Sequence, residues 1–131
     1  MVDNTDNRKK FISVEETPVW QLSHELTLKI YKITDKFPKS ETYGLTSQIR
    51  RSASSIPANI SEGFYRNSTK ELIQFLFNAR GSYGETLYHL RLGKDLGYIY
   101  DSVYKEIVDG YLHLGKQLNG WIKSLKARIN H

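Results

Sequence analysis

The chain has 131 residues, of which 39% are hydrophobic and 25% charged, with a net charge of +5 and no cysteine. This length and composition predict one globular domain with its own core and argue against a disordered chain. The missing cysteines exclude disulfides, thiolate zinc sites and cysteine nucleophiles, while the positive charge permits an anionic partner such as RNA without requiring one.

The first residues and the apolar runs bear on where the protein works. No apolar stretch approaches the roughly 20 residues that span a bilayer. Residues 1–10 are polar and charged, unlike the apolar centre of a signal peptide. We therefore expect a cytoplasmic protein without a membrane partner. We also expect residues 1–16 to form a polar, partly disordered arm and residues 17–131 to form the folded domain.

The first helix is expected over residues 18–36. Pro18 suits the first helical position, and Thr17 is a candidate N-cap. Apolar residues recur at steps of three or four and so share one face. They are Val19, Leu22, Leu26, Ile30, Ile33 and Phe37. Another face carries Lys29, Lys32 and Lys36.

The second helix is expected over residues 41–64, with Pro57 inside it. An internal proline removes one backbone hydrogen bond and clashes with the preceding turn, so the sequence predicts a kink near residues 53–57. Residues 48–63 are rich in small and polar side chains that are poor helix formers. Such a segment needs support from its neighbours in the fold.

The third and fourth helices are expected over residues 68–96 and 101–128. Ser68 and Glu71 have the spacing of a capping box, and Gly97 favours termination. The apolar residues of the fourth helix follow a nearly heptad pattern, which is typical of a long bundle helix. Since short loops make sequential helices antiparallel, the sequence predicts an all-α, up-down-up-down four-helix bundle.

Glycines and tyrosines predict close contacts. Glycine within a helix costs up to about 1 kcal/mol relative to alanine, so we expect close packing of helices or subunits to compensate. The helical glycines considered are Gly81, Gly84, Gly110, Gly115 and Gly120. Tyr98, Tyr100 and Tyr104 cluster before and within the start of the fourth helix. We expect packing roles for them rather than stacking on RNA bases.

The sequence contains no recognisable catalytic or metal-binding motif. The histidines fall outside catalytic patterns, and although His24 and His113 could approach each other across helices, we expect a surface or interface role for them. Glu85 and His89 have a four-residue spacing that occurs once, unlike the repeated Glu-x-x-His of di-iron bundles. We therefore predict no enzyme, no metal, no cofactor and no small-molecule substrate.

Polar residues on the second and third helices allow two interpretations. In one, an ion-pair network fixes the pairing of helices or of subunits, and Arg51 contacts Glu85 while Glu62 lies near Arg66 and Lys70. The members of that network are Arg51, Ser55, Asn59, Glu62, Arg80 and Glu85. In the other, cationic side chains bind nucleic acid, because arginine forks suit phosphate oxygens. These candidates are Lys29, Lys32, Lys36, Arg50, Arg51 and Arg80.

Residues 48–63, which read QIRRSASSIPANISEG, carry a resemblance to a known family. Together with residues 19–22, 43–45, 79–86 and 96–99, they resemble the bacterial four helix bundle protein family, also called the ribosomal-RNA intervening-sequence protein family. The resemblance covers about residues 18–126 and leaves the N-terminal arm outside.

The resemblance implies a homo-oligomer, since barrel-like pentamers are known among relatives. Some members are encoded in insertions within large-subunit ribosomal RNA genes. Others resemble the accessory protein of diversity-generating retroelements, which binds nucleic acid and reverse transcriptase. We therefore expect a non-enzymatic homo-oligomer, a pentamer by resemblance, that binds RNA or another nucleic acid or is associated with the ribosome. The alternative is a protein–protein interaction scaffold without nucleic-acid contact.

Overall fold

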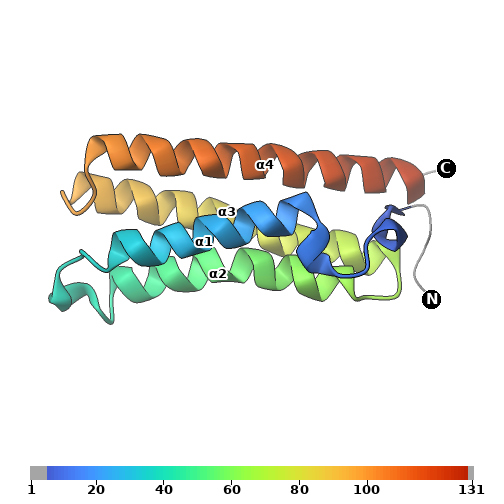
Figure 1. The fold of residues 1–131 in the computed structure, drawn as a ribbon, viewed down its shortest axis with the longest axis horizontal. Coiled ribbons are helices and arrows are strands. Elements are labelled where there is room, and N and C mark those ends of the chain that lie inside the picture. Colours follow the sequence, from blue (N-terminus) through green and yellow to red (C-terminus); the bar gives the residue numbers. More distant parts are fainter. Residues whose placement is uncertain (1–5, 130–131) are drawn as a thin grey trace.

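The computed structural model describes residues 6–129 and contains four long helices. They are α1 (Pro18–Thr34), α2 (Leu45–Phe64), α3 (Thr69–Asp95) and α4 (Asp101–Ile129). Consecutive helices run in opposite directions, and both ends of the described chain lie at the same end of the bundle (Figure 1). Each helix packs against two others, because α1 contacts α2 and α4, and α3 contacts the same two. The predicted all-α four-helix bundle is confirmed.

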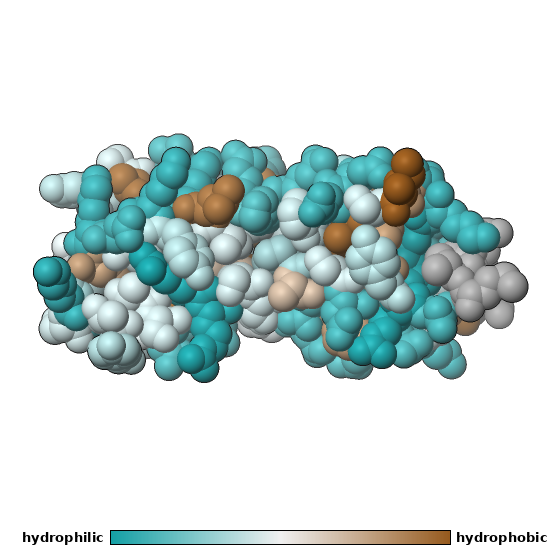
Figure 2. Space-filling model, turned by 60° about the horizontal axis from the view of Figure 1, so that its bottom comes forward, coloured by the Kyte–Doolittle hydropathy of each residue, from teal (hydrophilic) through white to brown (hydrophobic). Residues whose placement is uncertain are grey.

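The core consists of the apolar stripes of the four helices. Ile30, Ile56, Leu76 and Leu118 are completely buried, one from each helix. On the face shown in Figure 2, hydrophobic atoms form a few small, separate patches among hydrophilic ones. Among residues 6–129, no helix is long and apolar enough to cross a membrane.

The helix ends follow local capping chemistry with one correction. Ser68 accepts a hydrogen bond from the Glu71 amide at 3.2 Å, and Gly97 ends α3 with a φ of 82°. However, α2 begins at Leu45 rather than at residue 41. The chain first forms the short 3₁₀ helix η4 (Lys39–Glu41), whose Glu41 carboxylate then accepts from the Leu45 amide at 3.1 Å. The helix α2 continues through Pro57, and the kink there stays a prediction.

The segment before α1 packs on the bundle through two 3₁₀ helices, η2 (Arg8–Lys10) and η3 (Val14–Glu16). Arg8 is 2% exposed and donates to the Gly63 and Phe64 carbonyls at 3.4 and 3.2 Å. Its guanidinium also pairs with the buried Asp6 carboxylate at 2.6 Å. Residues 1–5 of the predicted arm lie outside the described residues, and its partial disorder stays a prediction.

Two of the helical glycines, Gly110 and Gly115, lie where another helix approaches closely, as predicted. A Cβ at Gly110 would come within 2.6 Å of Leu26 Cδ2, and one at Gly115 would collide with the Tyr83 hydroxyl. At Gly81, Gly84 and Gly120, an added Cβ would have no neighbour within 4 Å in the described chain beyond the backbone of its own helix and the adjoining residues. Packing within the chain therefore does not compensate for these three, and packing between subunits stays a prediction for them.

Candidate nucleic-acid interface

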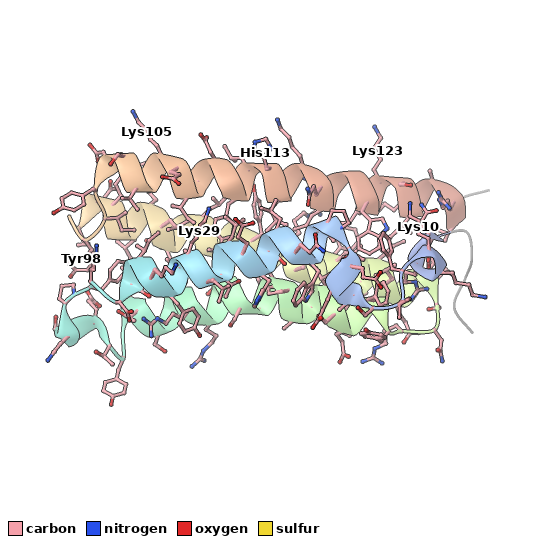
Figure 3. All side chains as sticks on the ribbon, in the orientation of Figure 1. Lys10, Lys29, Tyr98, Lys105, His113 and Lys123 are labelled. Atoms are coloured by element: carbon pink, nitrogen blue, oxygen red, sulfur yellow. The ribbon has the colours of Figure 1, made fainter. Side chains whose placement is uncertain are left out.

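The predicted lysine face lines an open groove between α1 and the start of α4. The groove has a volume of about 720 Å³, and Lys32 and Lys36 form part of its wall together with Tyr98 and Tyr100. Lys29 borders an adjoining hollow of about 310 Å³, which Lys32 also lines. Figure 3 shows Lys29 along α1 and Tyr98 at the end of the bundle. The structure thus brings the three predicted lysines to one side of the molecule.

The lysines of this groove form few ion pairs with the rest of the described chain. Among residues 6–129, neither Lys32 nor Lys36 has an ion-pair partner. Lys29 lies 3.7 Å from Glu25, with both side chains about half exposed. Exposed pairs of this kind contribute little, because water screens them. An incoming anion would therefore compete with few internal carboxylates.

Two tyrosines at the end of the groove differ in their contacts and exposure. Tyr98 donates its hydroxyl proton to Glu41 Oε2 at 2.8 Å, and its ring packs on Phe37 with centroids 5.4 Å apart. The hydrogen bond to the Glu41 carboxylate raises the pKa of Tyr98. The pKa of Glu41 is lowered, mainly by the hydrogen bond from the Leu45 amide and also by the one from Tyr98. Tyr100 is 81% exposed, so the packing role predicted for it is wrong. Both tyrosines belong to the loop before α4 rather than to a helix.

The Arg50 side chain is hydrogen-bonded to other residues of the fold. It donates to Thr34 Oγ1 at 2.8 Å and to Asp35 Oδ1 at 3.1 Å, and its guanidinium lies 4.5 Å from the Tyr31 ring centroid. These bonds fasten the C-terminal end of α1 to α2. By contrast, the side chain of the neighbouring Arg51 is exposed and has no polar partner within the described chain.

Arg80 lies on the α3–α4 side and not in the groove. It donates to Asn119 Oδ1 at 3.0 Å and stands 4.9 Å from the Phe77 ring centroid, a ring that Lys126 also approaches, at 4.7 Å. The predicted cations therefore do not form one continuous surface. The lysines gather in the groove, while Arg51 and Arg80 stand apart from it.

The predicted polar network is built differently from expectation. The Arg51–Glu85 contact is not formed, because Glu85 instead lies 4.0 Å from His89 Nε2 on the next turn of α3. Glu62 pairs with Arg66 at 3.2 Å, one of the two neighbours predicted for it. The roles of these residues in a subunit interface stay predictions.

Small polar side chains connect α2 to α3 in place of the predicted ion pairs. Ser55 and Ser82 are hydrogen-bonded at 2.8 Å, and Asn59 donates to Ser55 Oγ at 3.0 Å. Deeper in the interface, Thr86 donates to Ser52 Oγ at 2.9 Å. The small polar residues of α2 are thus satisfied within the chain. Their pairing explains how a segment of poor helix formers remains helical.

His89 completes this buried cluster and was not predicted as part of it. Its Nδ1 lies 3.3 Å from Ser52 Oγ, and the residue is 9% exposed. Burial lowers the pKa of His89, and the nearby Glu85 carboxylate opposes that effect. The four-residue spacing of Glu85 and His89 was the available signal, but its partner Ser52 lies 37 residues away in the sequence.

Comparisons with known proteins agree with this fold. Residues 15–120 match the model of the 23S rRNA-intervening sequence protein family. A solved structure from Bacteroides thetaiotaomicron VPI-5482, described as a protein with unknown function from the S23 ribosomal protein family, is 30% identical. The likeness covers 80% of this chain and 98% of that one, with a TM-score of 0.73. The comparison with curated proteins gave no match. The four-helix chain thus belongs to the 23S rRNA-intervening sequence protein family.

Proposed function

We propose that this chain is a non-enzymatic, homo-oligomeric accessory protein that binds RNA or another nucleic acid through the α1–α4 groove. The observation that carries the proposal is that Lys32 and Lys36, without ion-pair partners in the described chain, share one groove with Tyr98 and Tyr100. Lysines neutralise phosphates, and tyrosine rings stack on bases. The family's description, which refers to 23S rRNA, supports the same class of partner.

Titration with labelled RNA and DNA tests the nucleic-acid contact. We expect binding that weakens between about 50 and about 200 mM salt, since each phosphate contact releases counterions. The double variant Lys32→Gln with Lys36→Gln should reduce the slope of log K against log salt by roughly 1.4–1.8. Fluorescence anisotropy at several salt concentrations measures both quantities.

A matched control separates the groove from the net charge. Lys105 and Lys123 point outward from α4 (Figure 3), and replacing both by glutamine removes the same charge from another surface. This control should change the slope by much less. Equal losses in the two double variants would assign binding to net charge alone, and negligible affinity even at low salt would contradict the proposal.

Homo-oligomerisation is the second part of the proposal. Gly81 and Gly84 on α3 and Gly120 on α4 are exposed, and an added Cβ there would meet nothing within 4 Å in the described chain beyond its own helix backbone and the adjoining residues. Tyr88 on α3 is 62% exposed and Leu112 on α4 is 47% exposed. Small residues permit close approach, and exposed apolar side chains are stabilised by burial against a partner.

Light scattering on the purified chain and on Arg51→Ala tests assembly and distinguishes the alternative. For the pentamer implied by the resemblance, the mass should be near five times 15.2 kDa. Arg51 is exposed and does not line the groove, so its loss should leave that mass and the binding of nucleic acid in the groove unchanged. Dissociation of the Arg51→Ala oligomer would instead favour a protein–protein scaffold without nucleic-acid contact.

A further inference from the structure

The shape of the α1–α4 groove restricts which form of nucleic acid enters it. Its volume of about 720 Å³ is that of a small-molecule site rather than of a surface that covers a double helix. Ile33, Pro38, Ile99 and Val103 line it together with the lysines and the tyrosines. An apolar lining suits the flat face of an unpaired base, whereas a duplex presents phosphates and sugars on its outside.

Two acidic groups near the groove, Glu41 and Asp35, have other partners. Glu41 accepts from the Leu45 amide and from the Tyr98 hydroxyl, and Asp35 pairs with Arg50 at 3.1 Å. The groove itself is lined by Lys32 and Lys36 and by no carboxylate among the described residues. Glu106 lines the adjoining hollow with Lys29 and Lys32. A phosphate inside the groove itself meets the positive charge of Lys32 and Lys36 with no carboxylate in the described lining.

The aromatic groups supply one fixed and one accessible ring. Tyr98 is held by its bond to Glu41 and by its contact with Phe37, so it forms a rigid part of the wall. Tyr100 lies two residues further along and exposes 81% of its surface. A tyrosine ring has only two side-chain torsions to fix, so this exposed ring can stack on a base at a low cost in conformational entropy.

Resting on the proposed function, we infer that this groove takes single-stranded RNA or DNA, with an unpaired base stacked on Tyr100 and phosphates on Lys32 and Lys36. Every base has a π-face, so this mode tolerates many sequences. Bases inside a duplex are already stacked on their neighbours and are not available to Tyr100.

Anisotropy titrations with two RNA probes test the inference. One is an unstructured oligouridine of about 12 nucleotides, and the other is a blunt duplex of about the same length. The wild-type chain should bind the oligouridine roughly 10-fold more tightly than the duplex, since a stacked base is worth about 1–3 kcal/mol. Tyr100→Ala should weaken oligouridine binding by about the same factor and leave duplex binding unchanged.

Two further variants make the result specific. Tyr100→Phe keeps the ring and should retain oligouridine binding. Tyr43→Ala removes an equally open tyrosine, 96% exposed, that does not line the groove, and should have no effect. Circular dichroism should show every variant folded, because both positions are exposed.

The outcomes of these titrations distinguish failure of the single-strand inference from failure of the proposed nucleic-acid binding. If the duplex binds as tightly as the oligouridine, or if Tyr100→Ala matches Tyr43→Ala, the single-strand inference is overturned. The proposed function would still stand in that case, provided that the Lys32 and Lys36 double variant lowers binding. If neither probe shows salt-dependent binding, the proposed function itself fails.

Discussion

Replacement of Arg8 by alanine is expected to lower the free energy of unfolding by about 3–5 kcal/mol, the usual cost of breaking a buried ion pair. Asp6 is completely buried and would keep a hydrogen bond from Thr69 but lose its cation. The carbonyls of Gly63, Phe64 and Arg66 would lose a shared donor at the end of α2. Urea unfolding followed by circular dichroism measures the loss.

Arg66→Ala is the matched control for Arg8→Ala. Its side chain is 42% exposed and pairs with the exposed Glu62, so its removal should cost under about 1 kcal/mol. If Arg8→Ala behaves like this control, the segment before α1 does not stabilise the bundle. Hydrogen exchange would then show residues 6–16 opening without global unfolding.

Gly63→Ala is expected to lower the free energy of unfolding by about 1–3 kcal/mol, although alanine is the better helix former. An added Cβ would lie 2.8 Å from Phe75 Cβ and 3.3 Å from the Leu72 carbonyl oxygen. Neither atom can move without a shift of the α3 backbone. The substitution therefore forces α2 and α3 apart at one of their closest contacts.

Gly120→Ala on α4 is expected to raise the free energy of unfolding instead. Apart from its chain neighbours and the backbone of its own helix, nothing in the described chain lies within 4 Å of the added Cβ, so the gain in helix propensity should raise the free energy of unfolding by up to about 1 kcal/mol. Thermal unfolding of both variants at low protein concentration compares them. A stabilised Gly63→Ala would show that α3 yields at this contact.

The helices were predictable because their signals are local. Apolar periodicity, Pro18, Ser68 and Gly97 each act within a few residues, and they place the four helices and three of the four starts closely. The start of α2 was missed because Glu41 caps it from within a 3₁₀ turn, which apolar spacing does not reveal. Topology followed from the short loops.

The candidate site was predictable only in part. The spacing of Lys29, Lys32 and Lys36 places them on one side of α1, as the structure shows. Arg50 looks equally available in the sequence, but Thr34 and Asp35 engage it from a neighbouring helix. The polar residues of the N-terminal segment predict a partly disordered arm. No local sequence pattern indicates that Arg8 binds the backbone carbonyls at the C-terminal end of α2.

The cluster around Ser52 and His89 restricts how α2 can slide along α3. A displacement by one turn, about 5.4 Å, would separate Ser52 from His89 and Ser55 from Ser82. Each buried polar group left without a partner would cost about 1–3 kcal/mol. The segment poorest in helix formers is therefore the one that selects a single alignment of the two helices.

Both ends of the described chain lie at the end of the bundle remote from Tyr98 (Figure 1 and Figure 3). With 29 residues, α4 is about 43 Å long, so residues 6 and 129 lie nearly a full bundle length from the groove (Figure 1). Terminally labelled protein is thus suited to binding measurements. A domain fused at either end would likewise leave the α1–α4 groove open.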